Sequence, residues 1–448
     1  MRKFILTFLF VALLIFPTLG CSNKKDTTKI LGGYAEYELI PNNISGPLYI
    51  SGYKQGVEIE GILDYQKVKA LYLSYYGNEV LMISIDCIGL SSDTINKIRQ
   101  GINRKININI ASTHTHAGID TLGLWGPAAI NGKNEEFMNL LVSTAIKAGN
   151  DAIYSQKQGL LTYGQIETEN ILEDSRHPYV YDENIYQLRF IPNDNSEATR
   201  MIFYGAHAEA LRSENKLLSA DFPGQVSKII KDNSGDNCIY FNGAIGGLII
   251  TKVFDNQDPV NNMKITGEKI AKYVLSIKEE KLEDGVLKQV TCEFKIELEN
   301  TLYQYYKFLG ILGNPIIKNI FNGKYYLKTE TSILQISNLT FLLIPGEIFP
   351  ELVSGGSYLN PESSKSNPQT IKEIAESKNI QNLIIIGLCN DEIGYIVPPS
   401  DFLVNEEYPY IKNKEDHNGE NHYEETNSVG INAAYELIKA LQNALDKL

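Results

Sequence analysis

The sequence contains only six histidines in 448 residues, so where they fall carries information about chemistry. They are His114, His116, His177, His207, His417 and His422. His114 and His116 follow the apolar run Ile106 to Ala111, and His207 follows the run Met201 to Ala206. Imidazole binds zinc well and, with an unperturbed pKa near 6.5, carries protons near neutral pH. The placement therefore points to metal-assisted or acid–base chemistry.

Three further polar side chains follow apolar runs in the same way. Asp86 ends one such run, Glu347 ends a second, and Tyr395 follows a third after a short polar turn. Ligand sites in α/β sheets collect beyond the carboxyl ends of strands, so we expect these side chains to converge with the histidines. Two histidines and a carboxylate form a common catalytic zinc set that leaves room for water. A single histidine is more often a structural side chain, but the joint pattern favours a metal site.

Short β-rich runs alternate with helical patterns along the chain, and this alternation predicts an α/β fold. The elements of that fold must position the residues named above. We expect one large domain of mixed β-sheets flanked by helices. The predicted strands are Val80 to Ile85, Ile106 to Ala111, Met201 to Ala206, Ile333 to Ile344 (broken near Asn338) and Leu383 to Leu388. The predicted helices are Asp93 to Asn103, Glu135 to Ala152, Gly224 to Asp232, Ile265 to Glu280 and Ala433 to Leu445.

His114 and His116 lie two residues apart, the spacing at which side chains share one face of a strand. His114 and His116 share the even register of Ile106, Ile108 and Ile110. Side chains alternate along a strand, so both histidines would project from the core face if the strand continues that far.

The N-terminus is typical of an export signal. Residues 1–20 combine a basic start with a short apolar stretch, and they end just before Cys21. A small residue directly before a cysteine resembles the lipobox of bacterial lipoproteins, in which the cysteine is acylated. We therefore expect a polar tether over residues 21–30, a domain over residues 31–448, and a lipid-anchored protein of the cell envelope. The alternative is a plain secretory signal with an incidental cysteine.

Composition narrows the functional classes further. The net charge is −13 and no basic run occurs, which argues against nucleic acid and against electrostatic docking on anionic lipid. HExxH, GxSxG and GxxxxGK[ST] motifs are absent, so the chain is not readily a zincin, a serine α/β-hydrolase or a P-loop enzyme. Without a CxxC pair, the later cysteines are expected to be mostly buried free thiols. Tyr303 to Asn322 is an apolar and aromatic stretch that we interpret as a surface insertion.

An ordered series of segments resembles the neutral (neutral/alkaline, non-lysosomal) ceramidases. The segment from Asn109 to Gly118 resembles the THTHSG segment of that family, and Gly205-Ala206-His207 resembles its second histidine segment. Ile344 to Glu347 resembles its PGE. Other matching pieces are Gly52-Tyr53, Ser84 to Asp86, Ser219 to Gly224, Asn390 to Tyr395 and His422 to Glu424. The resemblance covers roughly residues 30 to 445.

The resemblance implies a zinc hydrolase acting on the amide of a ceramide-like or other N-acylated lipid, through water activated by zinc. It implies His116 beside that water as a catalytic group and Tyr423 near the substrate carbonyl. Trp125 is expected to contact the substrate. The implied zinc ligands are His114, His207, Glu347 and Tyr395.

One departure bears on the substrate. The family carries a serine in a Gly-x-x-Ser-Pro segment, and Ile249 falls at that place here. Ile249 is therefore expected to contact the substrate without a hydroxyl, which would favour substrates less polar than ceramide. Two alternatives stay open. One is a zinc hydrolase of the same fold acting on another amide or ester, and the other is a zinc- or lipid-binding surface lipoprotein that has lost catalysis.

Overall fold

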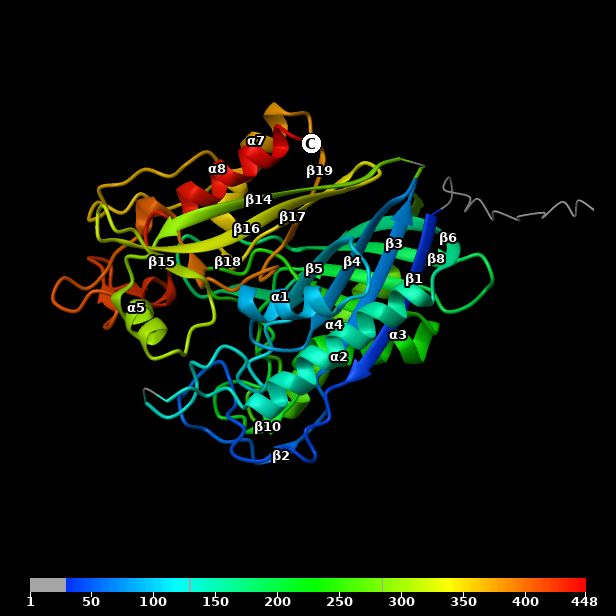
Figure 1. Ribbon diagram of the computed structural model, residues 1–448, viewed down its shortest axis with the longest axis horizontal. Coiled ribbons are helices and arrows are strands. Elements are labelled where there is room, and N and C mark those ends of the chain that lie inside the picture. Colours follow the sequence, from blue (N-terminus) through cyan, green and yellow to red (C-terminus); the bar gives the residue numbers. More distant parts are fainter. Residues whose placement is uncertain (1–29, 129, 284) are drawn as a thin grey trace, which may run out of the picture.

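The computed structural model describes residues 30–128, 130–283 and 285–448 (Figure 1). The export signal, Cys21 and the tether lie outside these residues, apart from Ile30, where the first strand begins. The chain forms an α/β domain with two main sheets, which confirms the predicted fold class.

The larger sheet has nine strands and mixed direction. Its path runs β11-β9-β8-β6-β1-β3-β4-β5, with β13 paired to β6. The pairs β4–β5 and β9–β11 are parallel, and the other pairs are antiparallel. Its strands are β1 (Ile30–Glu38), β3 (Lys67–Tyr75), β4 (Asn78–Ile85), β5 (Asn107–Ser112), β6 (Lys157–Glu167), β8 (Asn184–Pro192), β9 (Thr199–Tyr204), β11 (Asn237–Asn242) and β13 (Glu280–Lys281).

The second sheet has five strands in the order β14-β16-β17-β19, with β15 paired to β16. Its strands are β14 (Leu287–Glu297), β15 (Ile316–Lys318), β16 (Tyr325–Ile336), β17 (Leu339–Leu343) and β19 (Asn382–Ile386). The break near Asn338 falls between β16 and β17, as predicted. The smaller pairs are β2 (Gly61–Ile62) with β10 (Leu217–Leu218), β7 (Leu172–Asp174) with β12 (Ile249–Thr251), β18 (Glu347–Ile348) with β20 (Tyr395–Ile396), and β21 (Lys414–Glu415) with β22 (Asn421–His422).

The two main sheets pack face to face, and helices cover their outer faces (Figure 1). Alternation along β3 illustrates why: Leu73 packs between the sheets, whereas Tyr72 packs beneath the helices. Phe203 from the first sheet and Phe341 from the second lie 5.2 Å apart by ring centroid in the layer between the sheets. The result is a four-layer arrangement of helices, sheet, sheet and helices.

All five predicted helices are found. The described helices are α1 (Ser92–Gly101), α2 (Glu135–Tyr154), α3 (Asp221–Ser234), α4 (Pro259–Ser276), α5 (Thr301–Phe308), α6 (Pro350–Ser354), α7 (Ile371–Ser377) and α8 (Ala433–Leu445), with short 3₁₀ turns at Pro399–Asp401 and Glu424–Asn427. Of these helices, α5, α6 and α7 were not predicted. The prediction for α4 was wrong at both ends. Asp258 caps the helix before Pro259, and the backbone is extended at Ile277.

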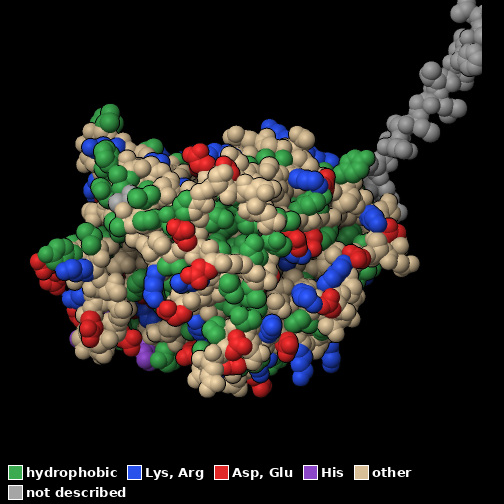
Figure 2. All heavy atoms as spheres, turned by 90° about the horizontal axis from the view of Figure 1, so that it is seen from below, with side chains coloured by type: hydrophobic (Ala, Val, Ile, Leu, Met, Phe, Trp, Pro, Cys, Tyr) green, Lys and Arg blue, Asp and Glu red, His purple; other side chains and the backbone are tan. Residues whose placement is uncertain are grey.

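The cysteines and the helices also bear on the sequence-based expectations. Cys87, Cys238 and Cys389 are buried free thiols, while Cys292 is half-buried, which agrees with the predicted mostly buried thiols. Within the described ranges no helix is long and apolar enough to cross a membrane. On the face shown in Figure 2, acidic and basic side chains are interspersed.

The carboxyl ends of strands from both sheets meet at one place. The backbone N–H of Ser112, at the end of β5, donates to Leu388 O at 3.2 Å, and the N–H of Asn390 donates to Ile110 O at 2.8 Å. The N–H of Gly387 donates to Asn242 O, at the end of β11, at 3.0 Å. These bonds hold the loop after β19 against the loops after β5 and β11, so loops from both sheets can share a site.

Candidate metal centre and substrate cavity

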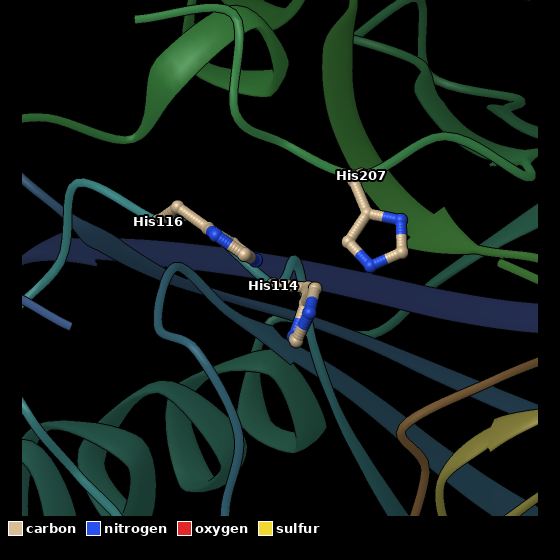
Figure 3. A group of neighbouring side chains, drawn as sticks. All are labelled: His114, His116 and His207. Atoms are coloured by element: carbon tan, nitrogen blue, oxygen red, sulfur yellow. The ribbon is translucent and has the colours of Figure 1, made fainter. Parts of the chain in front are cut away.

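His114, His116 and His207 converge at the junction of the two sheets (Figure 3). One potential ligand atom from each lies within 4.8 Å of the others. The ring centroids of His114 and His207 are 4.9 Å apart, and those of His114 and His116 are 4.8 Å apart. The predicted convergence of the three histidines is therefore found.

The strand register is not what brings the pair there. Strand β5 ends at Ser112, and His114 has a left-handed backbone with φ of 60°. The loop is instead held by a parallel bridge between Thr115 and Ala208, beside His207. The strand therefore does not continue as far as the two histidines, and the shared register does not explain their position. The two histidines face one another because the loop turns, and His207 joins them through the bridge.

Hydrogen bonds fix the tautomers of His114 and His207. The Nδ1 atom of His114 lies 2.6 Å from Ile88 O, and Nδ1 of His207 lies 2.9 Å from Ile249 O. A carbonyl can only accept, so each Nδ1 carries the proton, and the neutral ring presents Nε2 as an acceptor. Bonds of this kind to backbone carbonyls orient histidines that ligate metals.

Both Nε2 atoms point at one carboxylate oxygen. Glu347 Oε2 lies 3.0 Å from Nε2 of His207 and 3.5 Å from Nε2 of His114. All three side chains are buried. Three acceptor atoms facing one another without a cation would repel, so the arrangement requires a proton or a metal ion between them. The donor set of two imidazoles and a carboxylate fits zinc.

The pKa values of His114, His207 and Glu347 reflect their burial and their proximity to one another. Burial lowers the pKa of His114 to about 3 against the opposing pull of Glu347. Burial also disfavours charge on His207, but its bond with Glu347 outweighs this and raises the His207 pKa. Burial works against charge on Glu347 as well, yet His114 and His207 lower its pKa overall. A buried carboxylate that stays ionised among imidazoles suits a cation site.

His116 differs from the other two histidines because neither ring nitrogen has a hydrogen-bond partner although both are buried. Its nearest charged neighbour is Glu209, with Oε2 3.5 Å from Nδ1. The Tyr53 hydroxyl donates to the same Glu209 oxygen at 2.5 Å. Gly52, with φ of 111°, leaves room for the imidazole, since a Cβ there would lie 2.6 Å from it. His116 is packed in place with its ring nitrogens uncommitted.

A cavity of about 400 Å³ opens beside this cluster. Tyr395, Tyr423 and Trp125 all line it, so the structure brings each of these predicted residues to the site. Tyr395 pairs with Glu347 in the β18–β20 ladder. Burial, together with Glu347, raises the pKa of Tyr423 to about 12, so its hydroxyl keeps its proton at neutral pH. Elsewhere the wall has apolar side chains, Ile88, Leu122, Leu124, Leu302, Leu312 and Leu327, together with polar ones such as Gln55, Asn314 and Asn413.

Two residues expected at the site are elsewhere. The side chain of Ile249 is fully buried in the core beside α3 and α4, and it does not line the cavity. Its contribution is its backbone carbonyl, which accepts from Nδ1 of His207. Asp86 also does not line the cavity; its carboxylate accepts from the backbone N–H of Lys67 at 2.9 Å. The expectation for Ile249 rested on the family resemblance and that for Asp86 on its position after a strand, and neither fixes the direction of the side chain.

Ile249→Ser is therefore expected to destabilise the protein without changing which N-acyl chain is preferred. It removes buried apolar volume and buries a hydroxyl, a change that costs about 2–5 kcal/mol for Ile→Ala alone. Urea unfolding measures this loss, and Ile250→Ser, at a half-buried neighbour, is the matched control with a smaller effect. A stable Ile249→Ser variant with altered substrate preference would contradict the assignment.

Several residues at the site were given no role by the sequence analysis. Glu209 and Tyr53 form the wall against His116, and Tyr303 and Glu392 line the cavity near Glu347. Burial, together with Glu347, raises the pKa of Glu392 well above its usual range. For Glu209 the available signal was its position two residues after His207, and for Tyr53 it was the Gly52-Tyr53 piece of the family resemblance. Asp221 likewise holds the histidine loop, because its carboxylate accepts from the backbone N–H groups of Ala210 and Leu211.

No family model and no curated protein matches the chain by sequence. Solved structures do match its fold. A crystal structure of neutral ceramidase from Pseudomonas aeruginosa aligns with a TM-score of 0.69 and 16% identity, covering 94% of this chain and 75% of that one. A ceramidase complexed with C2 aligns with a TM-score of 0.67 and 15% identity, covering 94% and 76%. The chain therefore has the fold of the neutral ceramidases, with a buried histidine cluster at the junction of its two sheets.

Proposed function

We propose that this protein is a zinc-dependent hydrolase that cleaves the amide of a ceramide-like or other N-acylated lipid. One observation carries the proposal: His114 and His207, each fixed by a backbone carbonyl, aim Nε2 at the same oxygen of Glu347. We propose these three residues and Tyr395 as the ligands. Bound zinc would supply a Lewis acid that lowers the pKa of water toward neutrality.

The remaining groups can do the proton chemistry of amide cleavage. His116 is buried, adjacent and free of hydrogen-bond partners, so it can take a proton from water and return it to the leaving nitrogen. Tyr423 lines the same cavity with its hydroxyl protonated, so it can donate to the carbonyl oxygen as negative charge develops there. Glu209 and Tyr53 hold the ring of His116 from behind.

The cavity supports a substrate with an acyl chain. Its volume falls within the range of small-molecule sites, and leucine and isoleucine side chains make much of its wall. Trp125 offers further aromatic surface for the chain. The solved structures with this fold are described as ceramidases, which favours an amide over an ester.

The test couples metal content to turnover. The purified protein is expected to contain close to one zinc per chain and to hydrolyse one or more members of an N-acyl panel: ceramide, an N-acyl amine and an N-acyl amino acid, with matching esters. Chelation should abolish turnover and zinc should restore it. Turnover of the esters alone would indicate the same-fold alternative. Stoichiometric zinc without any turnover would indicate the binding-protein alternative, and absence of zinc would overturn the proposal.

A further inference from the structure

Exposed apolar side chains gather in two short neighbouring segments, the end of α5 and the region of β15 and the turn after it; they are Phe308, Leu309, Ile317, Ile320 and Phe321, and we call them the apolar patch. Phe321 is 93% exposed, Phe308 86% and Ile320 85%. Among the large apolar residues that the structure describes as exposed, only Tyr154 reaches a comparable value. Single exposed hydrophobic residues are ordinary, but several within one short stretch mark an interaction surface.

The fold brings the two parts of the apolar patch to the same end of the second sheet. Strand β14 ends at Glu297, opposite Tyr326 of β16, and the next N–H, of Leu298, donates to Tyr325 O at 2.8 Å. Helix α5 follows and ends at Phe308, while the turn over residues 319–324 joins β15 to β16. In Figure 1 both lie at the left end of the molecule, and hydrophobic side chains project at that end in Figure 2.

The same segment forms part of the cavity wall. Leu302, Tyr303, Tyr306 and Leu312 belong to α5 or to the loop after it, and all four line the cavity. The inner side of α5 therefore contacts the substrate space, whereas its end bears the exposed Phe308. An apolar chain leaving the cavity past α5 would meet the apolar patch.

Charge distinguishes this segment from the rest of an acidic protein. Residues 300–329 contain four lysines and no aspartate or glutamate, in a chain with net charge −13. Lys324 and Lys328 pair with Glu297 and Glu293, just outside the segment, whereas Lys318 has no ion pair among the described residues. A surface of exposed aromatic and apolar groups flanked by lysines fits the interface of a lipid bilayer.

We propose that the apolar patch docks the protein on a membrane surface, with the cavity mouth facing the lipid. The docking is independent of the proposed hydrolysis, whereas the view that the docked lipid is also the substrate rests on it. Because two of the four local lysines, Lys324 and Lys328, are paired with glutamates, apolar insertion is the main attraction. Binding therefore occurs on zwitterionic vesicles and becomes stronger on anionic ones.

The test uses a chain that begins at Ser22, which lacks Cys21 and keeps every described residue. Co-sedimentation with phosphatidylcholine vesicles, with and without phosphatidylglycerol, gives the partition coefficient. Phe308→Ser and Phe321→Ser are each expected to lower it about tenfold, and together about a hundredfold. Tyr154→Ser, 91% exposed on α2 away from the cavity lining, is the matched control and should leave it unchanged.

Turnover of a short, water-soluble N-acyl amide separates docking from catalysis. The double variant should retain this turnover while losing turnover of vesicle-embedded substrate. Equal vesicle binding by the wild type and the double variant would overturn the docking proposal, even if soluble turnover is normal. Loss of a dimer in the double variant without loss of vesicle binding would also overturn it, since the apolar patch would then contact a second copy.

Discussion

Glu347→Ala and His207→Ala are each expected to release the zinc and abolish hydrolysis. In the described geometry one oxygen of Glu347 faces Nε2 of both His207 and His114, so removing either partner leaves too few donors. Changes in groups that merely orient zinc ligands cost about 10–100-fold in affinity, and loss of a ligand costs more. Metal analysis after dialysis should find zinc near one per chain in the wild type and little in either variant.

His417→Ala is the matched control for this experiment, because His417 is partly exposed and pairs with Glu362 outside the cavity. It should retain both zinc and activity. Full zinc in both Glu347→Ala and His207→Ala would disprove the ligand assignment. The fold itself is checked by circular dichroism, since removing a buried carboxylate from among imidazoles changes core electrostatics.

His116→Ala is expected to keep zinc and to lose activity by roughly 10²- to 10⁴-fold, the loss typical of a general acid–base. Distances alone permit another arrangement, in which His114, His116 and His207 together hold the metal. The two arrangements differ in chemistry. Only His114 and His207 have Nδ1 bound to a carbonyl, whereas both nitrogens of His116 lack a partner.

Measuring zinc and turnover on the same His116→Ala sample decides between the two arrangements. Zinc retained with activity lost makes His116 the proton carrier. Loss of zinc along with activity would make His116 the third ligand. Proton transfer would then fall to another group, and Glu209, whose Oε2 lies 3.5 Å from Nδ1 of His116, is the adjacent carboxylate.

Much of the fold is predictable because local patterns and tertiary structure agree. The helix Ala433–Leu445 and the strand Val80 to Ile85 have unbroken apolar periodicity, and they occur within two residues of the predicted bounds. The pairing of two sheets face to face is not predictable from such runs. It depends on strands such as β3 being buried on both sides, which removes the alternation that would mark one side as solvent-facing.

Position at strand ends predicted most of the proposed ligands but not all of the site, because Asp86 follows β4 and yet lies away from the cavity. His114, His207, Glu347 and Tyr395 lie after β5, after β9, at β18 and at β20, so the carboxyl-end rule brings them together. Ile249 begins strand β12, which pairs with β7, and its side chain points into the core. Glu209 reaches His116 only because the Thr115–Ala208 bridge fixes both loops, and no short-range pattern encodes that bridge.

The proposed ligands come from loops after two strands of the first sheet and from the later β18–β20 pair, and this has a consequence for the order of events during synthesis. All three histidines of the cluster leave the ribosome well before Glu347 and Tyr395. A nascent chain that has only the first sheet therefore holds an incomplete set, and with the proposed ligands it would gain full metal affinity only after β18 and β20 have docked. Under the proposed ligand assignment, metal capture would then be a late step that stabilises the finished arrangement. An ion present at 1,000 times its dissociation constant would add about 4 kcal/mol to the free energy of unfolding.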